Sequence, residues 1–286
     1  MIYCGMAQWH HPSWCDWVYP SKMASSERLA AYAQVFNSVE VGSTFYADVS
    51  STQLQHWFEL VPDSFRFSFK APQAITHHFD QKSEAQVVGE WRGFIDRIGP
   101  LASKLGPIML QFPAKLDGSY LHLIERLLEC WALPTPLSVE VRNLSFFDKR
   151  DGEVSLLRLL REHSADRVIM DSRPVFSVVA DTPALVDAQS KKPRVPCHAV
   201  VTANNPVVRF IGHPDLSRNQ RWLDEWAKKI AIWLVEGRTP YVFVHTADNV
   251  DAPALAQHLM ALIPNYLPSF SQQIFLPSKP AQIHLL

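Results

Sequence analysis

Short runs of apolar residues recur along the chain, separated by longer segments in which apolar and polar residues mix. Eight of these runs have the length and the Val, Ile, Phe and Tyr content of buried β-strands. They are Ile2–Gln8, Val35–Val41, Phe65–Lys70, Ile108–Phe112, Leu137–Arg142, Arg167–Asp171, Val207–Gly212 and Tyr241–Thr246. Most of the intervening segments repeat apolar residues three and four positions apart, which predicts helices with one buried face. Examples are Ser83–Ile98, Tyr120–Trp131, Gly152–His163, Gln220–Glu236 and Ala252–Ile263.

The alternation of strands and helices predicts parallel β-α units joined by right-handed crossovers. Eight such units match a closed (β/α)8 barrel of the TIM type, which we expect to occupy residues 1–268 as a single domain. A doubly wound open sheet is the alternative, but the first run is not followed by the G-x-G-x-x-G turn of dinucleotide-binding members. The chain also lacks the short motifs of P-loop NTPases, zincins and α/β-hydrolases.

Two segments depart from this regular pattern. Ser172–Pro206, between the sixth and seventh runs, is much longer than an ordinary loop and is rich in proline. It also carries the basic residues Lys191, Lys192 and Arg194. We expect it to be an ordered excursion over one face of the barrel or an arm that contacts a partner, because prolines limit regular structure there. Residues 269–286 read as a C-terminal tail.

The composition narrows the classes of function. The chain has 286 residues, of which 27 are Lys or Arg and 28 are Asp or Glu, so the net charge is -1. This balance argues against a broad positively charged surface that would bind nucleic acid or an anionic membrane. No stretch approaches the roughly 18 apolar residues of a membrane helix, no signal peptide is evident, and four scattered cysteines are typical of reduced thiols. We therefore expect a soluble, cytoplasmic protein without a membrane partner.

Polar residues gather at the carboxyl ends of the predicted strands, where all β-α loops of a barrel begin. They are Glu40, Lys70, Gln111, Glu140, Arg142, Asp171, Arg209 and His245. Three carboxylates therefore balance three cations. A charged side chain in a buried strand costs several kcal/mol unless it is paired or functional. The pattern predicts either a structural salt-bridge network or a polar pocket that binds and converts a substrate.

In the functional interpretation, Lys70, Arg142 and Arg209 hold an anionic or carbonyl-bearing substrate. Glu140 or Glu40 acts as the proton-transfer base, with His77 as the acid partner. The remaining candidates are Asp171 in a catalytic role and Gln111, His245, Trp9 and Tyr46 in substrate binding. No motif implies a cofactor. A divalent metal held by the three carboxylates with His77 and His245 stays open, although three nearby cations would repel it.

Several segments resemble the YecE-like proteins, also called the domain of unknown function 72. The matching segments are Ile2–Trp9, Val39–Glu40 with Thr44–Tyr46, Phe65–Lys70, Ile75–His77, Leu110–Pro113, Val139–Arg142, Ile169–Pro174, Lys191–Pro193, Val208–Gly212 and Phe243–Thr246. The resemblance implies a TIM-type barrel with a polar pocket at the strand ends and implies no particular reaction. The chain departs from the family pattern at Gly42, where Asn is usual, and at His245–Thr246, where many members have Asn.

These observations predict an enzyme that uses acid–base chemistry on a small polar or anionic substrate, with hydrolysis, elimination and isomerisation all open. One alternative is a nucleic-acid-processing protein that grips a phosphodiester backbone with the barrel mouth and the Lys191–Arg194 segment. Another is a non-catalytic binding protein. The last residues, Gln282–Leu286, are similar to peptides that dock on the bacterial sliding clamp, and a tail packed on its own barrel is the alternative there. The oligomeric state is open.

Overall fold

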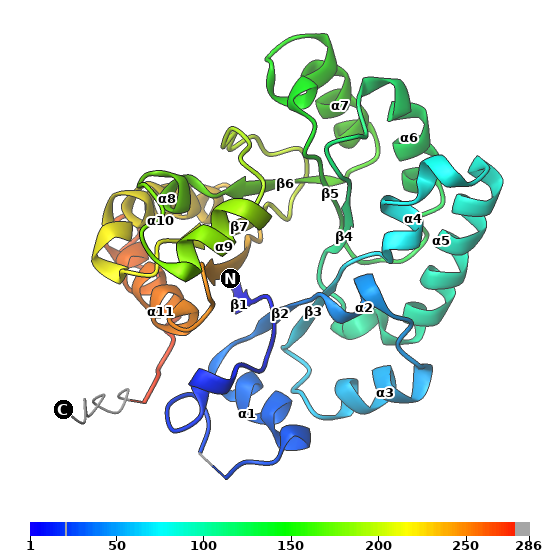
Figure 1. Cartoon of the computed structure of the whole chain (residues 1–286). Helices are drawn as coiled ribbons and strands as arrows, with labels where there is room; N and C mark the ends of the chain where they lie inside the picture. The colour runs from blue at the N-terminus through cyan, green and yellow to red at the C-terminus, as the bar shows by residue number, and fades with distance from the viewer. Residues whose placement is uncertain (21, 278–286) are drawn as a thin grey trace.

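Eight parallel strands surrounded by helices form the computed structural model, which describes residues 1–20 and 22–277 (Figure 1). The strands are β1 (Tyr3–Met6), β2 (Ser38–Val41), β3 (Arg66–Phe69), β4 (Ile108–Gln111), β5 (Leu137–Glu140), β6 (Asp166–Asp171), β7 (Val207–Gly212) and β8 (Tyr241–Thr246). Each lies within or close to a predicted run, because buried strands require the apolar residues that marked them in the sequence.

The described residues form eleven α-helices, of which α11 follows the last strand and the others lie between strands. They are α1 (Arg28–Val35), α2 (Ser43–Tyr46), α3 (Ser51–Glu59), α4 (Gln73–Thr76), α5 (Glu84–Ile98), α6 (Leu121–Glu129), α7 (Asp151–Glu162), α8 (Arg173–Phe176), α9 (Pro183–Lys191), α10 (Gln220–Val235) and α11 (Ala252–Leu262). Helix α5 shows why they form: Ser83 and Gln86 make a reciprocal capping box at its start, and its apolar stripe, from Val87 to Ile98, is buried.

The strands do not close into one barrel. Six of them form a half-barrel sheet in the order β1-β8-β7-β6-β5-β4, and β2 and β3 form a separate two-stranded sheet. The α/β class and the parallel pairing agree with the sequence. The prediction of a closed (β/α)8 barrel is wrong.

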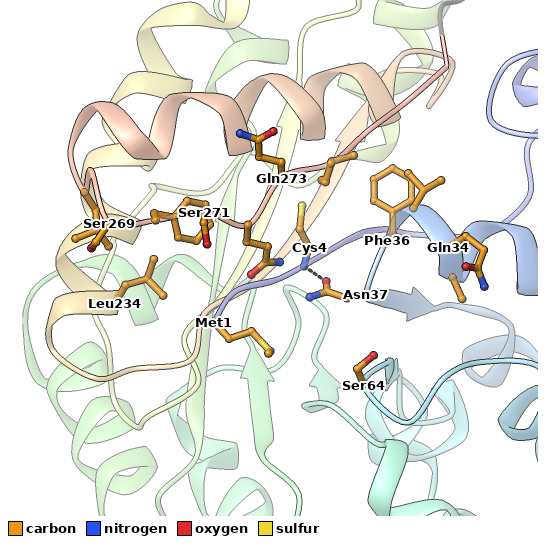
Figure 2. A pocket seen from close by; sticks show the side chains of 16 residues that line it. Met1, Cys4, Gln34, Phe36, Asn37, Ser64, Leu234, Ser269, Ser271 and Gln273 are labelled. Atoms are coloured by element: carbon orange, nitrogen blue, oxygen red, sulfur yellow. Dashed lines mark hydrogen bonds between the residues drawn. The ribbon is translucent and has the colours of Figure 1, made fainter.

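Side chains take the place of a ladder between β1 and β2. The side chain of Asn37 accepts a hydrogen bond from the Cys4 amide at 2.8 Å and donates one to the Ile2 carbonyl at 2.9 Å. The first of these bonds is drawn in Figure 2. The Tyr32 hydroxyl accepts from the Met6 amide at 2.8 Å. Because these groups satisfy the β1 backbone, no second strand is needed along that edge.

The other opening lies between β3 and β4. Only two isolated bridges join the residues there, Phe67 with Leu105 and Lys70 with Met109. Hydrophobic periodicity locates each strand, but it does not reveal whether a backbone edge is satisfied by another strand or by side chains. That is the physical reason why the sequence predicted closure and the structure shows two sheets.

The inner faces of the strands form two layers. Near the amino ends, apolar and aromatic residues pack together in a buried cluster made of Tyr3, Met109, Val168, Val207, Tyr241 and Phe243. Toward the carboxyl ends, the positions that follow on the same face are polar, among them Glu140 and Arg209. The apolar layer therefore lies directly beneath the charged layer, on the side of the strands' amino ends.

The predicted excursion contains more regular structure than its prolines suggested. Pro174 and Pro183 stand in the first turns of α8 and α9, where a missing amide hydrogen is harmless. Val175, Leu185 and Ala188 of these helices pack in one buried cluster with Met170 of β6 and Ile211 of β7. The segment therefore covers the carboxyl ends of β6 and β7.

The chain that follows α11 lies against the first strand. The side chain of Gln272 donates to the Ile2 carbonyl at 2.7 Å and accepts from the Ile2 amide at 3.2 Å, and Ile274 is buried. The proposed clamp-binding peptide, Gln282–Leu286, lies outside the described residues. Among the described helices, none has both the length and the apolar character needed to span a membrane.

Candidate functional site

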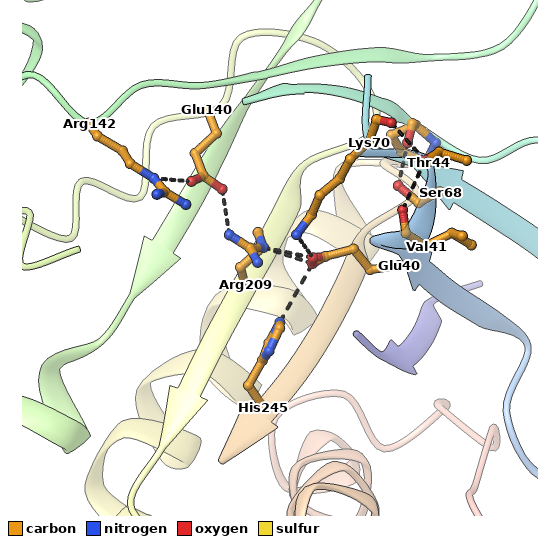
Figure 3. A network of polar contacts seen from close by, with 10 residues as sticks. Glu40, Val41, Thr44, Ser68, Lys70, Glu140, Arg142, Arg209 and His245 are labelled. Carbon is orange, nitrogen blue, oxygen red and sulfur yellow. Dashed lines mark hydrogen bonds and ion pairs between the residues drawn. The ribbon is translucent and has the colours of Figure 1, made fainter. Parts of the chain in front are cut away.

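A network of charged side chains occupies the carboxyl ends of the inner strand faces (Figure 3). Arg209 of β7 is at its centre. Its Nε donates to both oxygens of Glu40 at 2.8 and 3.1 Å, and its Nη1 donates to Oε2 of Glu140 at 2.7 Å. The ammonium of Lys70 lies 2.9 Å from Oε2 of Glu40. Residues from β2, β5, β7 and the end of β3 thus meet in one cluster.

Two further side chains extend this network. Arg142, just after β5, donates from Nε to Oε1 of Glu140 at 2.9 Å. His245 of β8 is fully buried, with Nε2 3.6 Å from Oε1 of Glu40, and neither ring nitrogen makes a hydrogen bond to any residue that the structure describes. Burial lowers the pKa of His245 to about 4, so the ring is neutral at pH 7.

Lys192, which the sequence places in the basic Lys191–Arg194 segment, is coupled electrostatically to the site. Burial and the charge of Arg209 lower its pKa, and the charges of Glu40 and Arg142 act on it as well. Its ammonium has no hydrogen bond or ion pair within the part of the chain that the structure describes. Its neighbour Lys191 points elsewhere and pairs with Asp187 at 2.5 Å. We call Lys70, Arg142, Lys192 and Arg209 with Glu40 and Glu140 the charged cluster.

The charged cluster is layered, with its carboxylates beneath its cations. The side chains of Glu40 and Glu140 are 0% and 2% exposed, whereas those of Lys70 and Arg142 are 14% and 23% exposed. Four cations against two carboxylates leave a net charge of +2. A ligand that enters from solvent therefore meets positive charge first.

The titration behaviour agrees with this layering. Burial opposes ionisation of Glu40, but Arg209 and Lys70 outweigh it and hold the pKa of Glu40 well below its usual value. Glu140 is buried too, and Arg209 and Arg142 lower its pKa. Burial and the nearby Arg209 lower the pKa of Lys70. Both carboxylates are thus ionised at neutral pH and committed to ion pairs.

His77 lies at the edge of the charged cluster, at the end of α4. Burial and the charge of Arg142 lower the pKa of His77 to about 4, and Glu140 opposes that change. Its Nδ1 is 3.0 Å from the Thr76 hydroxyl, and its ring packs edge-on against Phe45. A neutral imidazole thus stands beside a cationic pocket.

Three other candidates lie near the same end of the strands. Gln111 is in register with Glu140, and its buried Oε1 has no hydrogen-bond partner among residues 1–20 and 22–277. Trp9 and Tyr46 line a cleft of about 670 Å³ between the loops that follow β1 and β2, and Glu40 also lines it.

Asp171 does not join the charged cluster. Met170 is in register with Arg209, so the next residue, Asp171, faces the opposite side of β6. Its carboxylate accepts from Arg173 at 2.8 and 2.9 Å and from the Trp226 indole at 2.8 Å. The sequence therefore identified a polar strand end but not the face it occupies.

The geometry does not favour a metal at the strand ends. Asp171 is turned away, and each carboxylate of the charged cluster is bound by cations. Within residues 1–20 and 22–277, no group of three His, Cys, Asp or Glu side chains is placed to hold a metal ion.

A second cavity, of about 650 Å³, lies near the residues that precede β1, β2 and β3 (Figure 2). Met1, Asn37, Ser64 and Gln273 are among its lining residues. Among its described lining residues, Cys4 has the one titratable side chain, and burial raises the pKa of that thiol to about 12. A thiol held neutral is a poor nucleophile, so this cavity offers less chemistry than the strand ends.

Comparison with known proteins identifies the family. A family model described as "Protein of unknown function DUF72" matches residues 3–276. The chain is 38% identical over 285 residues to the UPF0759 protein YecE of Escherichia coli, with 100% of both chains covered. It is 31% identical over 295 residues to the UPF0759 protein YunF of Bacillus subtilis, covering 92% of this chain and 95% of that protein.

Solved structures show the same fold. A DUF72 family protein from Enterococcus faecalis matches with a TM-score of 0.68 at 19% identity, covering 94% of this chain and 98% of that chain. A DUF72 family protein from Thermotoga maritima matches with a TM-score of 0.66 at 23% identity, covering 94% and 100%. Together with the family model and the curated relatives, these matches show that the chain belongs to the DUF72 family, as its strand-end motifs indicated.

Proposed function

We propose that the chain is an enzyme that binds a small anionic substrate at the charged cluster and transfers a proton on it. The observation that carries the proposal is the layering of the charged cluster: its carboxylates are buried, its partly exposed side chains include the cations Lys70 and Arg142, and its net charge is +2. A structural network would place its charges in balance. Here the excess is positive, and an anion would complete it.

The two carboxylates act as positioning residues in this proposal. Arg209 is fixed by Glu40 and Glu140 through Nε and Nη1, while its Nη2 makes no hydrogen bond to the described residues. This leaves the two N–H groups of Nη2 available to a ligand oxygen. Because each carboxylate has a lowered pKa, neither is an effective general base at neutral pH.

His77 is the group that we assign to proton transfer. Its imidazole is neutral at pH 7, half-buried, and close enough to Arg142 for the guanidinium to lower its pKa. An anion bound at Arg142 would offset that charge and raise the pKa of His77 toward the physiological range, where proton transfer is most efficient. The reaction could be a hydrolysis, an elimination or an isomerisation.

The two adjacent lysines provide a sharp test of anion binding. The charges of Arg209, Glu40 and Arg142 act on Lys192, whereas Lys191 pairs with Asp187. With methylphosphonate as the probe in isothermal titration calorimetry, Lys192→Met should weaken binding by about tenfold or more, since a charge-assisted contact contributes about 1.5–3 kcal/mol. Lys191→Met should leave the affinity unchanged. Equal effects of the two substitutions would contradict the proposal.

A binding protein without turnover is the second candidate. It is favoured by the ion pairs made by both oxygens of Glu140. Conversion of small organic anions, followed by NMR, separates the two. In an enzyme, His77→Gln should abolish conversion and preserve methylphosphonate binding. A wild-type protein that binds the anions and converts none of them would be a binding protein.

A further inference from the structure

The cleft beside the charged cluster has an aromatic wall. Trp9, after β1, packs edge-on against Trp57 of α3, with ring centroids 4.9 Å apart. Tyr46, at the end of α2, is 76% exposed and packs edge-on against Phe45. Trp9, Trp57 and Tyr46 all line the cleft. Most of the Tyr46 side chain is thus open to solvent, so its ring is available to a ligand.

The cleft adjoins the charged cluster through shared elements. Glu40 lines the cleft and also binds Lys70 and Arg209. On α2, the Thr44 hydroxyl donates to the Lys70 carbonyl at 2.8 Å, which fixes the helix against the end of β3 (Figure 3). The aromatic wall continues from Tyr46 through Phe45 to the ring of His77. One ligand could therefore contact both the wall and the cations.

We propose that the cleft binds a planar aromatic ring of the same substrate whose anionic group binds the charged cluster. The substrate class is thus a small aromatic anion, such as an aryl phosphate, an aryl phosphonate or an aromatic carboxylate. This inference rests on the proposed function, because it presumes that the charged cluster binds an anion. A cleft of about 670 Å³ is within the size range of small-molecule sites and holds a ring easily.

Gly42 offers a way to fill the cleft without disturbing the fold. It lines the cleft, and a Cβ atom added there would meet no atom within 4 Å. Its φ of -87° and ψ of -15° suit any L-residue, so substitution brings no backbone strain. A leucine at this position would occupy space that the ring needs. Tyr46→Ala removes part of the wall, and Tyr266→Ala is its matched control, since Tyr266 is 42% exposed and lies outside the cleft.

The experiment compares phenylphosphonate with methylphosphonate by isothermal titration calorimetry. Both carry the same anionic group, and neither has a hydrolysable P–O–C bond, so only the ring differs. In the wild type, phenylphosphonate should bind about tenfold more tightly, which is the gain expected from one aromatic stacking contact. Gly42→Leu and Tyr46→Ala should each remove most of this gain while leaving methylphosphonate affinity unchanged. Tyr266→Ala should retain the full gain.

The outcomes separate this inference from the proposed function. Equal affinities of the wild type for the two phosphonates would overturn the aromatic substrate class and leave the anion site intact. A ring gain that persists in both Gly42→Leu and Tyr46→Ala would overturn the assignment of the ring to this cleft. Absence of binding by either phosphonate would overturn the proposed function as well.

Discussion

Replacing Glu40 by Gln tests whether the buried ion pairs of the charged cluster contribute more to folding stability than an exposed ion pair does. The carboxylate is fully buried and is bound by Lys70 at 2.9 Å and by Arg209 at 2.8 Å. A glutamine has the same shape and its oxygen can still accept from one cation. Its amide group, however, presents hydrogen-bond donors to a second cation, and the negative charge is lost. Both cations then remain buried with one partner fewer.

The expected loss follows from this geometry. Removing one member of a buried ion pair destabilises a protein by about 3–5 kcal/mol. We expect Glu40→Gln to lower the free energy of unfolding by about 3 kcal/mol, because Arg209 keeps its ion pair with Glu140 and the Lys70 side chain is partly exposed. Since the folded-state pKa of Glu40 is depressed, its contribution is fully present at pH 7 and is lost as the pH falls through that folded-state pKa.

Urea unfolding at pH 7, followed by tryptophan fluorescence, measures this loss. Glu236→Gln is the matched control, because Glu236 pairs with Arg238 at 2.8 Å with side chains that are 47% and 30% exposed. An exposed pair of this kind contributes less than about 1 kcal/mol. If Glu40→Gln lost no more free energy of unfolding than Glu236→Gln, with unchanged denaturant dependence, the reasoning from burial would be refuted.

Two pH-dependent predictions follow from buried titratable groups. Burial lowers the pKa of His245 to about 4, so this ring reduces the stability of the fold as the pH falls from 6.5 to 4, by up to about 3 kcal/mol. Measured by urea unfolding, the His245→Asn variant should lose correspondingly less stability than the wild type across that range. The same pH dependence of stability in the variant and the wild type would contradict this prediction. Burial raises the pKa of Asp166 to about 7, so stability falls as the pH rises from 3.8 to 7, by up to about 4 kcal/mol. Asp166→Asn should therefore be more stable relative to the wild type at pH 8 than at pH 4 in thermal melts, and the opposite order would show that the two hydrogen bonds from the Asn205 amide dominate.

The sequence predicted the strands well because burial on both faces leaves a clear apolar signal. The predicted runs Val207–Gly212 and Tyr241–Thr246 coincide with β7 and β8. The same signal brought Glu40, Lys70, Glu140 and Arg209 to one end of the strands, where the structure joins them. Their roles in binding and catalysis stay predictions.

The sequence could not predict that the sheet is open. Asn37 and Tyr32 satisfy β1 through side-chain hydrogen bonds, and such bonds leave no periodic pattern in the sequence. Gly5 shows how closely the two strands still approach: a Cβ atom there would lie 1.8 Å from the Ser38 carbonyl oxygen. A glycine in a strand is a signal of close approach, but it does not say which backbone comes close.

The net charge of the site is where the structure differs most consequentially from the sequence prediction. In strand β6 the three residues before Asp171, Val168–Met170, are all apolar, so no alternation shows which face that carboxylate occupies. By sequence, Lys192 belongs to the Lys191–Arg194 segment of the nucleic-acid alternative, and the packing of α8 and α9 over the strand ends brings it close enough for the charges of Arg209 and Glu40 to act on it. Removing Asp171 and adding Lys192 turns an even balance of three against three into two carboxylates against four cations. With an even balance of charges, a bound divalent metal remained a possible interpretation of the sequence. The observed excess of positive charge instead favours binding of an anion.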